Sequence, residues 1–453
     1  MRDFFIIAFI LASLPFIIRR PWLGVLMWFW IGLMNPHKLG WNVATTMPLA
    51  SVVGVVTLGA MLLSKDKKPI AWTKEMVLLV LLCIYYTFTT FFAWAPFEAW
   101  EQWDKVMKII LMTFVATKLI YGRERIHPLM LVIAFSIGFY GIKGGIFSIT
   151  TGGHFHVMGP ENTFISGNTS IGLAMLMVLP LLVFMAREET RKWLRTFYYA
   201  AFWLTIIATI FTYSRGALLG LAAMLPLMLL RTQRKFLVLL VVLPAAYIAA
   251  DFVPKELYSR AETVGSYEQD NSSMQRIQAW GVAFNVAKDH PLVGAGFNYE
   301  YAIDADRLWQ RYANFLGTWN NRARSTHSIY FQVLGQHGFI AFGLFMMLLI
   351  GTYFQAGRIK RVSATNPSQA WICNYASAIQ IGTIGYGVAG AFLSLAYFDL
   401  FYAYVAVLAI LHRELAETQQ EVPAMQSSTG WRGEAVMGSG DAGKNINPSA
   451  VAK

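Results

Sequence analysis

The chain has 453 residues, of which 56% are hydrophobic and only 14% are charged. A soluble globular domain carries about 25% charged residues, so this composition excludes an ordinary soluble enzyme and indicates an integral membrane protein. A net charge of +12 would suggest a nucleic-acid partner in a soluble protein. Clusters of Lys and Arg in cytoplasmic loops explain it better here, and we expect no nucleic-acid partner.

Apolar segments long enough to cross a bilayer follow one another along most of the chain. A spanning helix needs about 20 mainly apolar residues, and on this basis the sequence predicts an all-α polytopic membrane protein with about 12 to 13 transmembrane helices. The first two segments are short, which leaves both counts open. The predicted helices begin near Phe4, Pro21, Met47, Met76, Asp104, His127, Ser170, Leu194, Arg215, Phe236, Thr326, Trp371 and Ser394.

The charged connections predict the orientation of these helices. Basic residues occupy alternate connections, so they all fall on one side, which the positive-inside rule assigns to the cytoplasm. The basic connections are Arg19-Arg20, Lys65 with Lys67 and Lys68, Arg123 with Arg125, and residues 187–195, 231–235 and 357–361. The other connections face outward, toward the periplasm in a Gram-negative cell.

The predicted helices and loops divide the chain into four parts. Residues 1–253 are predicted to form an N-terminal transmembrane bundle, residues 254–325 a long periplasmic loop with amphipathic helices, and residues 326–416 the C-terminal transmembrane helices. Residues 417–453 are rich in Gly, Ser, Ala and Gln and lack apolar periodicity. This composition predicts a disordered cytoplasmic tail.

Arg215 interrupts an apolar segment, "FTYSRGALLGLAAMLPLMLL", which runs from Phe211 to Leu230. An Arg at the centre of a membrane helix costs roughly 2.5–3.5 kcal/mol on insertion scales. The alternation of the loops places Arg215 at the outer end of a helix instead, against the preference of Arg for the inner side. The side chain either reaches the lipid headgroups or binds an anionic partner.

The long outer loop contains a second candidate cation. In "QRIQAWGVAFNVAKDHPLVGAGFNYE", residues 275–300, Trp280 and Phe284 follow helical spacing with other apolar residues. This pattern predicts a short amphipathic helix on the membrane surface. Arg276 begins the predicted helix, and Pro291 with the glycines after it ends the helix.

Two histidines follow where the chain re-enters the membrane, in "STHSIYFQVLGQHGFIAFGLF". His327 and His337 are ten residues apart, so on one helix they would lie about 15 Å apart, too far to share a metal ion. The glycines Gly335 and Gly338 would let a ligand or another segment approach the backbone closely. Because a histidine inside the membrane is costly unless it is used or well paired, His337 is either functional or a packing residue bonded to a neighbour.

Other catalytic motifs do not occur in the sequence. It contains no GxxxxGK[ST] nucleotide loop, no HExxH motif and no GxSxG motif, and we expect no nucleotide, metal or other cofactor. Lys143 lies within "GIKGG", residues 141–145, near the outer end of its predicted helix. It is either a further anion contact or part of a helix that packs through its small residues.

Taken in order, these motifs resemble the O-antigen ligase/polymerase superfamily of polytopic membrane glycosyltransferases. The resemblance extends from Asn162 to Gly338 and rests on an Asn-containing outer segment with Asn168, Ser214-Arg215-Gly216, Arg276 with Trp280, Pro291 with Gly294 and Gly296, His327-Ser328 with Tyr330, and Gly335 with His337 and Gly338. The N-terminal third, with "RPWLGVLMWFWIGLMNPHKLGW" from Arg20, is similar to O-glycosylation ligases associated with exosortase systems. That label leaves the acceptor open, as lipid A-core or a protein.

The resemblance implies a GT-C-like glycosyltransferase of the bacterial inner membrane, with its active site facing the periplasm. The donor would be O-antigen on undecaprenyl pyrophosphate, and the acceptor a sugar hydroxyl of lipid A-core. Arg suits the pyrophosphate because its planar fork binds phosphate in two places, and a neutral His can take the hydroxyl proton. The implied catalytic residues are His337 and Arg215, in an inverting, metal-independent transfer. Substrate contacts are assigned to Arg276, Lys143, Asn168, His327 and Tyr330.

Three other functions fit parts of the sequence. An O-antigen polymerase and a protein O-oligosaccharyltransferase would use the same donor with a different acceptor. A transporter of lipid-linked glycans would also have about a dozen helices, but two related halves with broken helices are typical of that class. The sequence shows no such halves, and its unusual charges lie at the outer surface.

Overall fold

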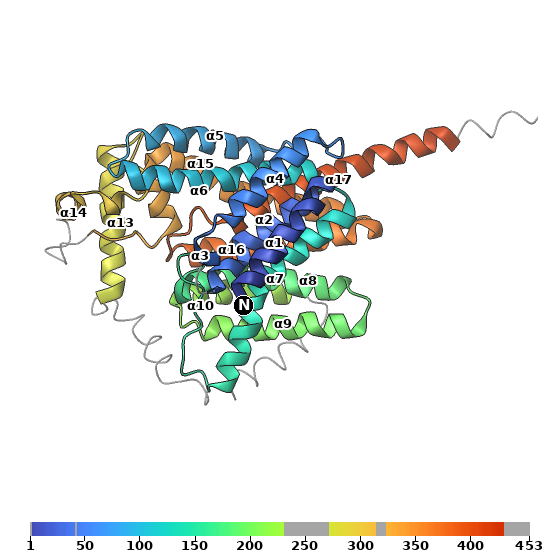
Figure 1. The fold of residues 1–453 in the computed structure, drawn as a ribbon, viewed down its shortest axis with the longest axis horizontal. Coiled ribbons are helices and arrows are strands. Elements are labelled where there is room, and N and C mark those ends of the chain that lie inside the picture. The colour runs from blue at the N-terminus through green and yellow to red at the C-terminus, as the bar shows by residue number, and fades with distance from the viewer. Residues whose placement is uncertain (1, 41–42, 231–270, 314–322, 430–453) are drawn as a thin grey trace, which may run out of the picture.

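The computed structural model describes residues 2–40, 43–230, 271–313 and 323–429. Helices dominate this part of the chain, and it contains no β-strand. The helices are α1 (Arg2–Arg19), α2 (Trp22–Met34), η1 (Pro36–Leu39), α3 (Val43–Thr46), α4 (Leu49–Leu63), α5 (Lys74–Thr90), α6 (Pro96–Leu119), α7 (Gly122–Thr150), α8 (Gly167–Glu188), α9 (Lys192–Ile210), α10 (Arg215–Leu230), α13 (Asn271–Asp289), η3 (Tyr299–Tyr301), α14 (Ala305–Tyr312), α15 (Ile329–Ser363), η4 (Pro367–Gln369), α16 (Ala370–Gly390) and α17 (Asp399–Thr429). Figure 1 shows their arrangement.

The prediction of an all-α polytopic membrane protein is confirmed. Among the described helices, α7, α8 and α15 are long and apolar enough to cross a membrane, and several shorter apolar helices accompany them. Each predicted span coincides with one of the helices α1, α2, α4 to α10 and α15 to α17, except the span near Phe236, which lies outside the described residues. The total of 12 to 13 spans stays a prediction.

The bundle is built around α8 and α17. Every residue from Ile171 to Leu182 in α8 and from Asp399 to Leu411 in α17 is buried, as expected for helices that are hydrophobic all round. The peripheral helix α1 instead exposes large apolar side chains such as Phe4 (71% exposed) and Phe16 (62%). An extended apolar surface of this kind suits contact with lipid rather than with water.

The basic connections meet at one end of the bundle. Arg125 lies 2.8 Å from the Asp66 carboxylate, and Arg123 lies 3.5 Å from the Glu188 carboxylate. These pairs join the loop before α5, the start of α7 and the end of α8. Three of the connections predicted to lie on the cytoplasmic side are therefore neighbours in space.

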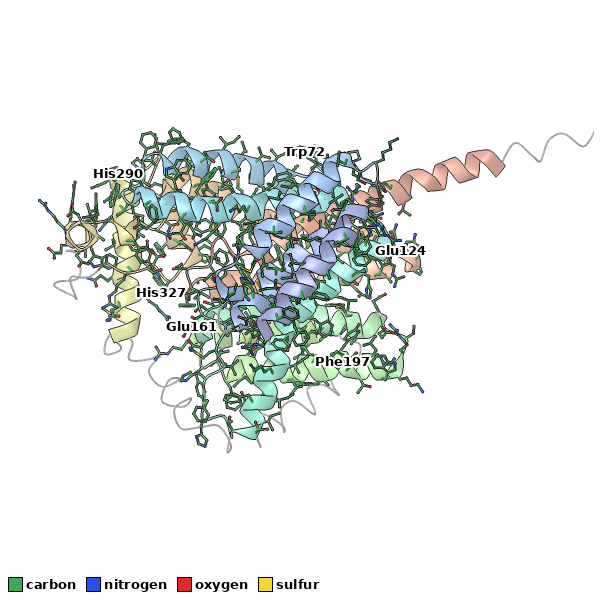
Figure 2. The ribbon with its side chains drawn as sticks, viewed as in Figure 1. Trp72, Glu124, Glu161, Phe197, His290 and His327 are labelled. Atoms are coloured by element: carbon green, nitrogen blue, oxygen red, sulfur yellow. The ribbon has the colours of Figure 1, made fainter. Side chains whose placement is uncertain are left out.

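The helix α13 lies across the opposite end of the bundle (Figure 1). It runs crosswise to α5, α6, α8 and α9, which is the arrangement expected of a helix at the membrane surface. Figure 2 places His290 and His327 toward this end and Glu124 toward the other. The chain thus has a basic end and an end covered by α13.

Two details of α13 differ from the sequence prediction. The helix spans Asn271–Asp289, so Arg276 lies in its second turn and not at its start. Phe284, assigned to the apolar face, is 44% exposed. The buried face of α13 is rotated by about one residue because α13 packs onto α15 and onto the loop that follows α13 itself. The buried residues of α13 include Ala279, Val282, Ala283 and Val286.

The C-terminal helix is longer than expected. α17 continues to Thr429, so residues 417–429 are helical where the sequence predicts a disordered tail. Glu and Gln in this stretch are good helix formers, and the helix simply extends from the last apolar segment. Residues 430–453 lie outside the described part of the chain. The same holds for residues 231–270, from the basic connection at 231–235 into the long loop, and for residues 314–322 of the long loop.

Candidate active site

Arg215 is the first residue of α10, and the residues before it explain why the helix begins there. The Ser214 hydroxyl accepts a hydrogen bond from the Ala217 N–H at 3.2 Å, which caps the first turn. Tyr213 has a φ of 53°, a left-handed conformation that is uncommon for residues other than glycine. Its hydroxyl donates to the Gly153 carbonyl at 2.5 Å. The turn is therefore held from both sides, and it fixes Arg215 at the N-terminal end of the helix.

The N-terminal end of α8 lies beside this turn. The Asn168 side chain, in the first turn of α8, donates to the Thr212 carbonyl at 2.8 Å. Farther along, a Cβ on Gly172 would lie 2.9 Å from the Ala217 Cβ, so a glycine is needed for α8 and α10 to pack this closely. Two helix N-termini therefore lie side by side, and each contributes the partial positive charge of its helix dipole.

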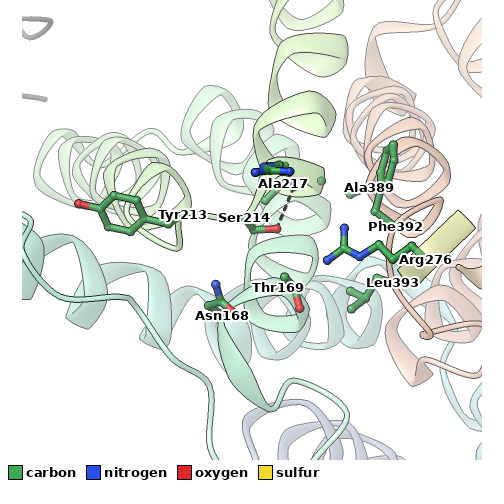
Figure 3. Close-up of a pocket in the computed structure, with 11 residues that line it drawn as sticks. Asn168, Thr169, Tyr213, Ser214, Ala217, Arg276, Ala389, Phe392 and Leu393 are labelled. Atoms are coloured by element: carbon green, nitrogen blue, oxygen red, sulfur yellow. Dashed lines mark hydrogen bonds between the residues drawn. The ribbon is translucent and has the colours of Figure 1, made fainter. Parts of the chain in front are cut away.

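A cavity of about 380 Å³ lies between these two helix ends and α13. Figure 3 shows Arg276 entering from the side opposite Asn168 and pointing toward Thr169 and Ser214. Two guanidinium groups and two helix N-termini thus face one space, which suits a polyanion such as a pyrophosphate. The lining residues are Asn168, Thr169, Tyr213, Ser214, Arg215, Gly216, Ala217, Arg276, Ala389, Phe392 and Leu393.

Trp280 fixes α13 over the cavity. It lies four residues after Arg276, on the same face of the helix, and its ring stacks on Phe331 with centroids 5.3 Å apart. The indole N–H donates to the Thr326 carbonyl at 2.8 Å, and the ring also contacts Phe392, which lines the cavity. Arg276 is therefore positioned by contacts with the first turn of α15 and the end of α16.

His327 lies next to this cavity. Its side chain is exposed, and its φ of 45° is strained for a residue with a side chain. The pKa of His327 is lowered by loss of hydration first, and then by the positive charges of Arg276 and Arg324. Ser325 fixes the same segment from another side, because its hydroxyl lies 2.8 Å from that of Ser394. His327 is thus open to solvent on one side and partly desolvated near Arg276, which disfavours the charged form of its imidazole.

The glycines around His337 form a structural contact with the loop after α13. The helix α15 is kinked at Gly338, whose φ is 75°. The kink frees the carbonyls of Gly335 and Gln336, which accept hydrogen bonds from the N–H groups of Ala295 and Gly296 at 3.0 and 2.8 Å. A Cβ on Gly294 would lie 2.6 Å from the Gln336 backbone. The segment from Pro291 to Gly296 therefore contacts the segment from Gly335 to Gly338 directly.

His337 is fully buried inside this contact. Its Nδ1 lies 2.6 Å from the Thr89 hydroxyl, and its ring packs against Tyr86 and Phe297 with centroids 4.4 and 4.3 Å away. It does not line the arginine cavity. This geometry is that of a packing residue, and the role of His337 as the base stays a prediction. Within the described residues, no group of three His, Cys, Asp or Glu could hold a metal ion.

Two further candidate residues lie away from the arginine cavity. The Tyr330 hydroxyl donates to the Gly387 carbonyl at 2.8 Å and joins α15 to α16. Lys143 lines a different cavity, formed by α7 and the segment before α8. The structure thus brings together Arg215, Arg276 and Asn168, places His327 beside them, and separates Lys143, Tyr330 and His337 from them.

Sequence reasoning missed several parts of the site. Thr169 lies beside Asn168, and the two helix starts in "SGNTS" and "YSRG" carry N-cap residues that could have predicted an anion site. Phe392 and Leu393 belong to the turn between α16 and α17, and their sequence carries no signal of its own. Their place in the cavity follows only from the packing of α16 against α8 and α10.

Two parts of the chain match known protein families. Residues 200–346 match the family described as O-Antigen ligase. The resemblance to the O-antigen ligase superfamily is thereby confirmed. Residues 1–190 match a family of unknown function, DUF5935. No curated protein matches the chain.

The arginine cavity combines residues from three parts of the chain. Arg215 and Arg276 belong to the O-antigen ligase region, Asn168 and Thr169 to the region of unknown function, and Phe392 to neither. The O-antigen ligase region together with the membrane helices indicates an enzyme of the membrane glycosyltransferase type. Residues of the first region thus line the same cavity as those of the O-antigen ligase region.

Proposed function

We propose that this protein is an O-antigen ligase, which transfers a polysaccharide from undecaprenyl pyrophosphate to a sugar hydroxyl of lipid A-core at the periplasmic face of the inner membrane. The observation that carries this proposal is the cavity lined by Arg215 of α10 and Arg276 of α13, together with the N-termini of α8 and α10. The match of residues 200–346 to the O-antigen ligases supports the class of reaction.

The reaction builds negative charge where the arginines lie. The acceptor oxygen forms a bond to the anomeric carbon of the donor sugar, and the bond from that carbon to the pyrophosphate oxygen breaks. The electron pair of that bond leaves with undecaprenyl pyrophosphate, whose negative charge increases by one. Guanidinium groups and helix N-termini that are already in place stabilise this charge without reorganisation. Direct displacement inverts the anomeric configuration, and no nucleotide is needed.

His327 is the residue best placed to take the proton of the acceptor hydroxyl. A general base must be neutral at the working pH and within reach of the reacting atoms. The lowered pKa of His327, caused by loss of hydration and by Arg276 and Arg324, keeps its imidazole neutral. Its exposure beside Arg276 leaves room for an acceptor. His337 lacks this access because it is fully buried.

The position of the cavity suits a donor with a lipid tail. The cavity lies at the end of the bundle opposite the basic connections, which the positive-inside rule places in the cytoplasm. A polyprenyl chain can stay in the bilayer beside the apolar outer helices while only its pyrophosphate enters the cavity. This explains why one arginine lies at the outer end of a bundle helix and another on the surface helix α13.

The test is a transfer assay with the purified protein, lipid-linked O-antigen and a rough lipopolysaccharide acceptor, in EDTA. We expect a ladder of glycosylated lipopolysaccharide from the wild type and none from Arg215→Ala. Polymer on the carrier without lipopolysaccharide product would identify a polymerase. Transfer to an added protein acceptor, but not to lipid A-core, would identify a protein O-oligosaccharyltransferase. Either result would overturn the ligase proposal.

A further inference from the structure

A second cavity lies at the same end of the bundle as the arginine cavity. Its volume is about 310 Å³. It is formed by the C-terminal part of α7, by the segment that leads to α8, and by the end of η1. The lining residues are Leu39, Tyr140, Lys143, Gly144, Phe147, His156, Val157, Met158, Gly159 and Pro160.

The two cavities share a wall. Tyr213 lines the arginine cavity, and its ring lies 4.8 Å from that of His156, which lines the second cavity. Figure 3 shows Tyr213 pointing away from Arg276. The Gly159 N–H donates to the Gly167 carbonyl at 3.0 Å, next to the start of α8. One ring and one short segment therefore separate the two spaces.

Lys143 projects into the second cavity because the glycines around it face the other way. A Cβ on Gly145 would lie 2.3 Å from the Leu204 carbonyl oxygen, and one on Gly141 would lie 2.2 Å from the Thr205 hydroxyl oxygen. These glycines let α7 pack closely onto α9. Lys143 lies midway between them in sequence, so its side chain projects from the opposite face of the helix. Its side chain is exposed.

The lining suits an amphiphile with an anionic head. The Tyr140 hydroxyl donates to the Met34 carbonyl at 2.6 Å, so Lys143 and His156 are the polar side chains available to a ligand. The other large side chains of the lining are apolar, and none of the described lining residues is acidic. A Lys ammonium binds phosphate as a point charge, while the apolar side chains bury hydrocarbon.

We propose that the second cavity binds the acceptor lipid of the transfer reaction and holds a phosphate of that glycolipid at Lys143. This inference rests on the proposed function and adds the site of the second substrate. Two substrates react fastest when their reacting atoms are held side by side, and the shared wall at Tyr213 brings the two sites together. The headgroup of an ordinary phospholipid has the same chemistry, and the experiment must separate the two sources.

The experiment measures the KM values of both substrates for Lys143→Ala in detergent. Loss of one charge-assisted contact should raise the KM of a phosphorylated rough lipopolysaccharide about tenfold, with little change in kcat or in the KM of the donor. Lys143→Arg should restore the acceptor KM. With a dephosphorylated acceptor, wild type and Lys143→Ala should behave alike. The matched control is Lys105→Ala, which removes an exposed Lys that pairs with Glu101 at 2.8 Å.

Three results would overturn the inference. A raised KM for the donor instead of the acceptor would make the cavity part of the donor site. Unchanged KM values would show that Lys143 binds neither substrate. Unchanged KM values together with phosphatidylglycerol vesicles that raise the melting temperature of the wild type, but not of Lys143→Ala, would identify a phospholipid as the occupant.

A binding measurement separates this inference from the proposed function. Native mass spectrometry with phosphorylated rough lipopolysaccharide alone needs no transfer. Weaker binding by Lys143→Ala than by wild type, in a protein that transfers nothing, would support the cavity and contradict the ligase. Equal binding by both variants, in a protein that does transfer, would support the ligase and contradict the cavity.

Discussion

The two ends of the helix bundle use arginine in different ways. At the basic end, Arg125 and Arg123 lie against the carboxylates of Asp66 and Glu188 and join neighbouring connections. At the other end, Arg215 and Arg276 line a cavity of about 380 Å³. The first group holds protein to protein, whereas the second faces a space large enough for a ligand.

The difference separates a topological role from a chemical one. The positive-inside rule accounts for arginine at the basic end without any function. One partner of each of these ion pairs is still largely open to water, and solvent screening keeps the contribution of such pairs small, about 1 kcal/mol each. The same rule disfavours arginine at the opposite end. A cation that is retained there, beside two helix N-termini, is better explained by an anionic substrate.

The largest expected effect comes from removing a cavity arginine. Arg215→Ala should lower kcat/KM about 10²- to 10³-fold, the range found when one group that stabilises transition-state charge is lost. Arg215→Lys should also be impaired, because Lys cannot make the bidentate contact. Transfer rates are measured with lipid-linked O-antigen in detergent. Arg125→Ala at the basic end is the matched control and should keep wild-type rates. Equal losses of rate in Arg215→Ala and Arg125→Ala would contradict a special role of Arg215 in the reaction.

The second prediction concerns the two histidines. His327→Ala should lower kcat about 10²- to 10⁴-fold, the usual contribution of a general base. His337→Gln should mainly destabilise the fold, by roughly 1–3 kcal/mol, because the buried contact of Nδ1 with the Thr89 hydroxyl and the ring packing against Tyr86 and Phe297 are lost. Melting temperature and transfer rate are recorded for both variants. A folded His337→Gln protein without activity, beside an active His327→Ala protein, would restore His337 as the base.

The third prediction concerns pH. The base must be neutral, and the pKa of His327 is lowered by loss of hydration and by Arg276 and Arg324. Activity should therefore persist below the usual pKa of histidine, near 6.5, and fall only at lower pH as the imidazole takes up a proton. Arg324→Gln removes one of the positive charges, so the acidic limb of the kcat/KM profile should move to higher pH. An unchanged limb would mean that another group titrates.

The smallest expected effect lies at the basic end. Arg125→Ala should lower the free energy of unfolding by about 1 kcal/mol or less, because the partner Asp66 is half exposed. Chemical denaturation in detergent measures this change, and high salt should reduce it further. A loss of several kcal/mol would show that the basic end is a structural core and not only a marker of orientation.

The sequence predicted the helices well because their signal is local. Each apolar segment carries its own length and hydropathy, and each predicted span within the described residues coincides with a helix. Arg215, Arg276 and Asn168 line one cavity. The sequence marks Arg215 and Asn168 as helix starts, whereas Arg276 lies in the second turn of α13. The rotation of α13 was missed because its buried face depends on where α15 lies, which no local pattern reveals.

The assignment of His337 shows the limit of motif reasoning. Glycines beside a histidine indicate that something approaches the backbone, and the structure shows that this is the loop containing Gly294 and Gly296. The motif alone cannot distinguish a protein segment from a substrate. Lys143 was likewise grouped with the arginines because all are outer cations, although the segment at His156 separates it from them.

The most direct test of the central claim is binding of undecaprenyl pyrophosphate itself to the purified protein. The Kd is measured for the wild type, for the double variant Arg215→Ala with Arg276→Ala, and for Arg125→Ala. We expect the double variant to lose binding at least about 100-fold, as for the loss of two charge-assisted contacts, and Arg125→Ala to bind like the wild type. Unchanged binding by the folded double variant would contradict the arginine cavity as the donor site.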